Sequence, residues 1–184
     1  MACIKKISSD LGFDCNNPGL IYGVSGVEEA VIINHEDVSS IVASPTKGTV
    51  TITLKGETRG YTIQCVKNSV QITEAARQND NAPTMLEITA NIKLLSALPV
   101  VTYINGLLSG SFLLAVRTKT NQYYLLGAHS PMEVSDMVTD SATDGVTTAT
   151  LKTPDGSCGD YRYSITAEQY AILKSDNQHG QEKN

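Results

Sequence analysis

The chain has 184 residues, of which 41% are hydrophobic and 18% charged, and its 14 Lys and Arg against 19 Asp and Glu give a net charge of −5. This length suits one domain with a buried core, and the acidic balance argues against the basic stripe that a nucleic-acid-binding surface needs. Charged residues are scarcer than the roughly one quarter usual in soluble domains. Thr, Ser and Asn fill the polar share, which favours a β-rich fold because stiff Thr side chains suit a pleated surface.

The two ends of the chain differ from its middle. Residues 1–25 show no sustained apolar periodicity and contain the turn-forming run Asn16–Gly19. The N-terminus lacks the apolar run of a secretion signal, and no stretch reaches the ~20 apolar residues of a membrane span. We expect an irregular N-terminal arm over residues 1–25, a single β-rich domain over residues 26–173, a flexible tail over residues 174–184, and no membrane partner.

Short alternating or β-branched runs predict strands through the first half of the domain. The clearest is Thr49–Lys55, where polar and apolar residues alternate and the apolar ones share one face. Ser69–Ala75 and Thr84–Leu94 alternate in the same way on either side of a polar loop, so we expect them to pair as a long hairpin. Further strands are expected at Glu28–Asn34, Val38–Ala43 and Tyr61–Val66.

One main helix is predicted, over about residues 96–109. Ser96 suits the N-cap, and Pro99 falls in the first turn, where its missing N–H costs little. Apolar residues recur at spacings of three and four up to Leu108, and Gly110 can end the helix in the left-handed conformation.

The last third of the domain returns to strands. Ser111–Thr118 and Tyr123–Ala128 flank a tight polar turn and predict a hairpin, whereas residues 129–145 are rich in turn formers and predict a loop. Val146–Lys152 and Tyr161–Ile165 are expected to form a closing hairpin. A short helical turn can follow at Ala167–Leu173, to the end of the domain. Strands in hairpins without βαβ alternation indicate an antiparallel β-sandwich or partly closed barrel with one flanking helix.

Few residues suggest chemistry. Asp136, Asp140 and Asp144 are spaced by four and could offer oxygen ligands to Ca²⁺ from a helix, but the rest of an EF-hand pattern is missing. The run His35–Asp37 suggests acid–base chemistry, yet it stands at a strand end, where polar residues gather in any case. We therefore expect no catalytic, cofactor-binding or metal-binding residues, and a protein that is not an enzyme.

The cysteines and the remaining histidines carry no recognisable pattern. Cys3, Cys15, Cys65 and Cys158 allow three pairings and match neither a disulfide scaffold nor a zinc site, and the missing secretion signal favours reduced thiols. His129 follows a strand and His179 lies in the tail. The adjacent Tyr123 and Tyr124 predict one inward and one outward ring, which fits a protein interface or ordinary strand packing equally well.

The overall pattern suits a subunit that packs against copies of itself. Few charges, abundant hydroxyl side chains, a long hairpin and an unpaired arm would all be explained by neighbours that cover the surface. A ring closes through heterologous contacts, so one face of a copy should meet a different face of the next. The candidate contacts are the 77–82 loop, the N-terminal arm and the 129–145 loop.

Three segments also resemble small virion structural proteins of tailed bacteriophages and prophages of Bacteroidales. The opening resembles that family in Met1–Cys3, Asp14-Cys15 and Gly19, followed by Glu29–Val38. Asn121–Gly127 resembles the family's hairpin, with Gln122 where the family usually has Gly, and Gly159–Glu168 resembles its last strand.

The resemblance implies a tail-tube-like or tail-ring subunit without catalytic residues, located in the virion after assembly in the host cytoplasm. Its expected partners are copies of itself, in a ring or tube around the DNA channel, and neighbouring virion proteins. Sequence-specific nucleic-acid binding is not expected, and an acidic wall would let DNA slide because it repels phosphate. The alternatives are a bacterial carbohydrate-binding or adhesion β-sandwich, which predicts exposed aromatic platforms, and a small β-barrel enzyme, for which only the His35 region offers titratable groups.

Overall fold

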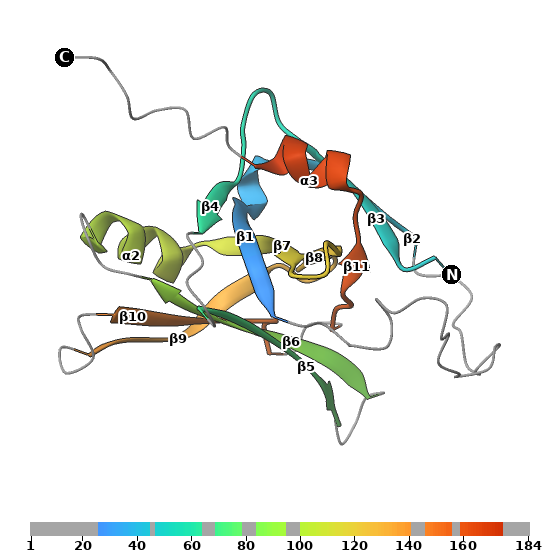
Figure 1. The fold of residues 1–184 in the computed structure, drawn as a ribbon. Helices are drawn as coiled ribbons and strands as arrows, with labels where there is room; N and C mark the ends of the chain where they lie inside the picture. The colour runs from blue at the N-terminus through green and yellow to red at the C-terminus, as the bar shows by residue number, and fades with distance from the viewer. Residues whose placement is uncertain are drawn as a thin grey trace, which may run out of the picture.

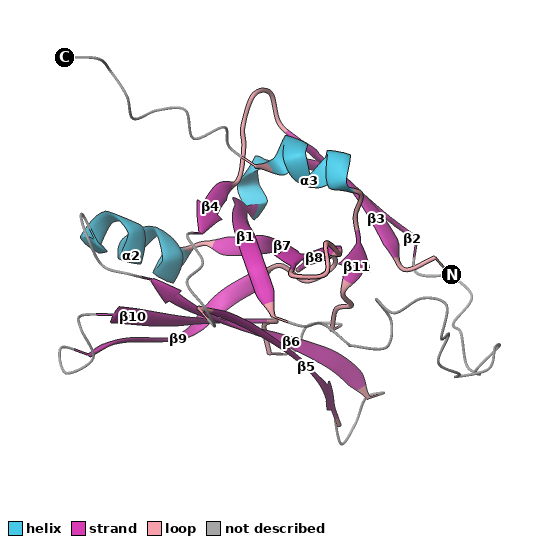
Figure 2. Cartoon of the chain, in the orientation of Figure 1, coloured by secondary structure: helices cyan, strands magenta, loops and turns pink. Residues whose placement is uncertain are grey.

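The computed structural model is mainly β-sheet (Figure 2). It describes residues 26–44, 47–63, 69–78, 84–94, 100–140, 146–155 and 159–174. The strands are β1 (Val27–Asn34), β2 (Val38–Ser44), β3 (Thr49–Leu54), β4 (Tyr61–Ile63), β5 (Val70–Arg77), β6 (Met85–Leu94), β7 (Ser111–Thr118), β8 (Tyr123–Leu126), β9 (Met132–Asp140), β10 (Val146–Lys152) and β11 (Tyr163–Ser164). The helices are η1 (His35–Asp37, a 3₁₀ turn), α2 (Val100–Ser109) and α3 (Ala167–Leu173). The expected N-terminal arm and all four cysteines lie outside the described residues, as do His179 and Asp144.

Strands β1 and β7 form the centre of the molecule. They run antiparallel, from Val27 opposite Thr118 to Asn34 opposite Phe112, and β4 pairs along the other side of β1. The far side of β7 is shared, because β8 pairs with its second half and β9 with its first two residues. The sheet therefore branches at β7.

The β7 sequence explains its central place. Five consecutive residues, Phe112–Val116, are buried, so both faces of the strand are covered. Leu114 and Val116 pack in a first core with β6 and β10, whereas Leu113 and Ala115 pack in a second core with β3, β8 and α3. A continuous apolar run is typical of a strand buried on both faces, where alternation would place polar groups in a core.

The layer below β1 and β7 in Figure 1 consists of β5, β6, β10 and β9. The expected long hairpin is confirmed, since β5 and β6 pair in register from Val70 opposite Ile92 to Arg77 opposite Met85. Ile88, Ala90 and Ile92 point from β6 into the first core. The free end of the hairpin extends beyond that core, so residues 73–77 are exposed.

The opposite face of β1 and β7 is covered by α3, β3 and β2 (Figure 1). The hydroxyl of Thr166 caps α3 by accepting a hydrogen bond from the Gln169 N–H (3.1 Å). Tyr170 and Leu173 of α3 are buried in the second core. Strand β11 lies between β8 and β3. It pairs antiparallel with β8 and makes one parallel contact with β3 of this layer.

The fold class is as expected, an open β-sandwich with a flanking helix, but the sheet is mixed because of the parallel β11–β3 contact. The expected loop over residues 129–145 is wrong, because Met132–Asp140 forms β9 and pairs with β10. Ser135 and Asp136 of β9 are exposed, and such polar residues are typical of a loop as well as of the outer face of a strand.

Two expectations about the C-terminal strands are also wrong. The segment 161–165 does not close a hairpin with β10 but pairs with β8 and β3. Tyr123 and Tyr124 do not divide into an inward and an outward ring, because β8 is also covered on both faces. Tyr123 packs on the second core with its ring 5.2 Å from that of Tyr170, and Tyr124 packs on the first.

Candidate functional site

Among the described strands, β2 and β5 form open edges at opposite ends of the strand order, and the short β4, which pairs only with β1, forms a third. Strand β2 pairs only with β3 among the described strands, and neither carries a charged residue. Their outer face presents Ser40, Val42, Thr51 and Thr53, all exposed, with Val42 at 68%. Natural edge strands are commonly protected from pairing with other chains by Lys, Pro or bulges. The β2 edge has one register shift, at Val38–Ser40, and no charge beyond it.

The β5 edge does carry charges, but other parts of the same chain neutralise them. Glu74 forms an ion pair with Arg162 (3.5 Å). Arg77 binds Glu87 (3.2 Å) across the hairpin and Asp155 (2.5 Å) in the loop after β10. Two hydrogen bonds, the stronger effect from Arg77 and the weaker from Lys152, lower the pKa of the Asp155 carboxyl. The hairpin is thus held against the rest of the fold while its outer edge stays unpaired among the described strands.

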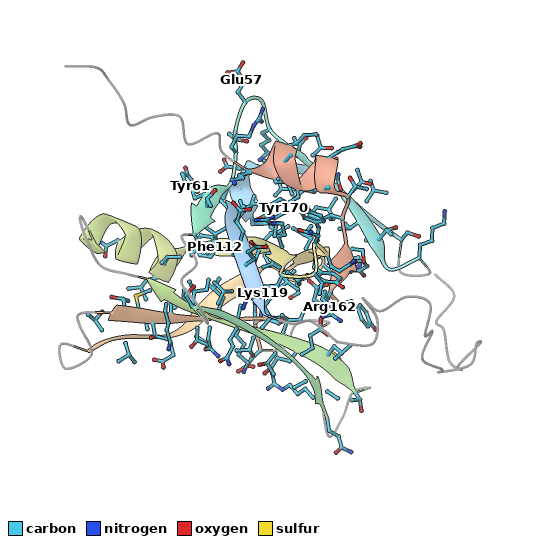
Figure 3. The ribbon with its side chains drawn as sticks, in the orientation of Figure 1. Glu57, Tyr61, Phe112, Lys119, Arg162 and Tyr170 are labelled. Carbon is cyan, nitrogen blue, oxygen red and sulfur yellow. The ribbon has the colours of Figure 1, made fainter. Side chains whose placement is uncertain are left out.

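Residues 159–162 contact the β5–β6 hairpin from another part of the chain, and we call them the anchor segment. The backbone N–H of Asp160 donates to the carbonyl of Leu86 on β6 (3.1 Å). Two residues on, the Arg162 guanidinium lies 4.7 Å from the centre of the Tyr124 ring on β8 and also reaches Glu74. In Figure 3 Arg162 lies between β11 and the layer that contains the hairpin.

Asp160 is buried, with 1% of its surface exposed. One carboxylate oxygen accepts hydrogen bonds from the N–H groups of His129 (3.1 Å) and Ser130 (3.3 Å), and the other accepts one from Tyr161 (2.7 Å). Burial raises the pKa of the Asp160 carboxyl, and the three N–H donors offset part of that rise. Asp160 therefore joins the loop after β8 to the anchor segment.

An aromatic cluster surrounds Asp160. The ring centroids of His129 and Tyr163 lie 5.4 Å apart in an edge-on arrangement, and those of Tyr161 and Tyr163 lie 6.4 Å apart. Tyr163 is fully buried, and burial, followed by the nearby Asp160 charge, raises its pKa. Tyr161 is 57% exposed, so one aromatic ring of this cluster faces solvent. Aromatic and Arg side chains of this kind are enriched at protein interfaces.

The residues singled out from the sequence are dispersed. Asp136 and Asp140 lie on β9, not on a helix, so four positions along the strand separate them by about 13 Å. Asp37 of η1 accepts a hydrogen bond from the Asn34 side chain (2.9 Å), and its neighbour His35 is exposed. In the described part of the chain, no three His, Cys, Asp or Glu side chains gather where they could hold a metal ion.

Of the two histidines in the described ranges, His35 and His129, it is His129 that contacts the Asp160 carboxylate, through its backbone N–H. Sequence reasoning missed Asp160, because a Gly-Asp-Tyr run in a Gly-rich loop is equally typical of an exposed turn. Of the candidate contact segments, the 77–82 loop is described only at residues 77 and 78.

Within the described ranges, no helix has the length and apolar character needed to cross a bilayer. Comparisons of the chain with protein-family models, with curated proteins and with solved structures gave no match.

Proposed function

We propose that this chain is a non-enzymatic, self-assembling virion subunit that forms part of a phage tail tube or a head–tail joining ring around the DNA channel. The observation that carries the proposal is the charge-free, exposed edge of β2 at one end of a sheet whose other open end is β5. Strand addition between copies supplies backbone hydrogen bonds along such an edge.

The edges of β2 and β5 differ, which suits a ring more than a two-fold dimer. A contact between β2 of one copy and β5 of the next is heterologous, and repetition of such a contact closes a ring when the rotation between copies allows it. The intramolecular ion pairs of Glu74 and Arg77 hold β5 in a fixed position without covering its outer edge. A fixed edge binds with a smaller loss of conformational entropy than a mobile one.

The net charge of −5 also supports the proposal, because the expected channel would contain DNA. Acidic walls repel phosphate, so DNA could pass without being held. The scarcity of charged residues supports it as well, because charges are depleted from the centres of protein interfaces.

The assembly experiment compares two lysine substitutions at exposed apolar positions. Val42→Lys places a charge on the β2 edge, whereas Leu108→Lys places it on α2 at a similarly exposed position (68% and 58%). Sedimentation velocity over a range of concentrations should show higher oligomers for the wild type and Leu108→Lys, and single chains for folded Val42→Lys. Equal assembly of the two variants would contradict a role for the β2 edge.

The alternative, a carbohydrate-binding or adhesion module, is favoured by one observation. Tyr161 exposes 57% of its surface next to the buried Tyr163 ring, and an exposed ring can stack on a sugar. A glycan array with the wild type and Tyr161→Ala tests it, and binding lost in the variant by a chain that stays monomeric would favour this alternative over assembly.

A further inference from the structure

The outer half of the β5–β6 hairpin belongs to neither core. Strand β10 ends at Lys152, opposite Thr89 of β6, and the hairpin continues beyond that point. We call residues 74–77 of β5 and 85–87 of β6 the flap. None of them is a member of the first or the second core, whereas Val70 and Ile88, further back in the hairpin, are. The flap is therefore held in place by contacts other than core packing.

Four charged side chains form a closed ring that joins one face of the flap to the end of β10. Arg77 forms ion pairs with Glu87 (3.2 Å) and with Asp155. Lys152 forms ion pairs with the same two carboxylates, at 3.4 and 3.3 Å. Both cations share one oxygen of each carboxylate, Oε2 of Glu87 and Oδ1 of Asp155. Each charge thus has two neighbours of opposite sign.

The ring and the anchor segment hold the flap from opposite faces. Strand alternation places Arg77, Glu87 and Lys152 on the face that points away from the first core. Glu74 lies on the other face and pairs with Arg162 of the anchor segment (3.5 Å). The two strands of the flap are thus fixed to the body of the fold mainly by charged side chains.

We propose that the flap is a hinged element with an electrostatic latch, which the four-charge ring closes at low ionic strength and which salt releases. The hinge lies where β10 ends, between the core-packed half of the hairpin and the flap. This inference is independent of the assembly proposed above, because it concerns opening within a single chain.

The exposure of the ring explains why salt acts on it. The side chains of Glu87 and Lys152 are 22% and 29% exposed, and those of Arg77 and Asp155 are 42% and 71% exposed, so dissolved ions reach all four. The Debye length falls from about 10 Å at 0.1 M salt to about 3 Å at 1 M, which is close to the ion-pair distances. A single exposed pair contributes little to stability, but a network of several charges contributes more.

Native-state hydrogen exchange by NMR, at constant pH and two salt concentrations, tests the proposal. The N–H of Asp160 donates to the Leu86 carbonyl in the flap (3.1 Å), so its protection reports flap closure. The reference is the N–H of Lys93, which donates to the Ser69 carbonyl at the base of the hairpin (2.7 Å). We expect the protection factor of Asp160, relative to that of Lys93, to fall about threefold from about 20 mM to about 1 M NaCl.

Charge substitutions assign this salt dependence to the ring. Asp155→Asn should lower the Asp160 protection at low salt and leave little salt dependence, whereas Asp136→Asn, on the exposed part of β9, should match the wild type. Arg77→Glu should also lower the protection. The double variant Arg77→Glu/Asp155→Arg should restore it together with its salt dependence, because the flap then carries two negative charges opposite two positive ones.

The salt series on the wild type needs no variant, and circular dichroism checks that each variant is folded. Relative protection of Asp160 that is equal at both salt concentrations in the wild type would overturn the proposal. A salt dependence that persists unchanged in Asp155→Asn, or a double variant no better protected than Arg77→Glu, would overturn it as well.

Discussion

Strand β7 is buried on both faces, and paired substitutions of its two adjacent leucines test this directly. Leu113 points into the second core and Leu114 into the first, and each has 0% of its surface exposed. A buried Leu→Ala substitution costs about 2–5 kcal/mol, from the lost transfer free energy and the cavity left behind. We expect about 3 kcal/mol for each of Leu113→Ala and Leu114→Ala, a large part of the 5–15 kcal/mol typical of a domain.

Urea unfolding measures the loss. With a denaturant slope of about 2 kcal/mol per M, a loss of about 3 kcal/mol lowers the midpoint by about 1.5 M. The control is Leu108→Ala on α2, which is 58% exposed and should shift the midpoint by only about 0.3 M or less. If only one of the two β7 variants lost stability, one face of β7 would be uncovered, and the account of two cores on either side of it would be refuted.

Three further substitutions test the anchor of the hairpin and the cap of α3. Gly159→Ala should lower the free energy of unfolding by about 1–3 kcal/mol in a urea melt, because Gly159 has φ of +71° and its new Cβ would meet the Leu86 carbonyl; an unchanged midpoint would argue against this close approach. Thr166→Ala should cost about 1 kcal/mol in the same assay and Thr166→Ser much less, since only the hydroxyl caps α3. Arg162→Met should speed proteolytic cleavage of the hairpin without a loss of strand content by circular dichroism, because the bond to Glu74 is lost; equal cleavage rates would show that this ion pair does not hold the hairpin.

Local patterns in the sequence predict most of the individual strands. The alternation in Thr49–Leu54 is strong because one face of β3 meets a core and the other is largely exposed. In the hairpin, β6 meets the first core along its second half, whereas β5 meets it only at Val70 and Ile72. The helix α2 was expected at residues 96–109 and is described over Val100–Ser109, while residues 96–99 lie outside the described ranges.

Pairing between distant strands could not be read from local patterns. The chain leaves β10 and continues along β6, where Thr153 exchanges hydrogen bonds with Ile88, before it crosses to β8. This long path is why the expected hairpin between β10 and β11 does not form. The uncharged sequence of β2 was visible from the start, but its position at an open edge depends on the whole strand order.

The candidate site was even less accessible to sequence reasoning. The burial of Asp160 depends on three segments that are distant in sequence, the loop after β8, strand β6 and the anchor segment. No spacing rule connects His129 with Asp160, because their contact is made through a backbone N–H that any residue except Pro would provide at position 129.

Electron microscopy of the purified wild-type chain at high concentration tests self-assembly most directly. We expect rings or tubes of uniform diameter, and we expect Val42→Lys, with its charge on the β2 edge, to abolish them while the chain stays folded. Single-chain particles at every concentration, with glycan binding in the same preparation, would contradict the proposed virion subunit.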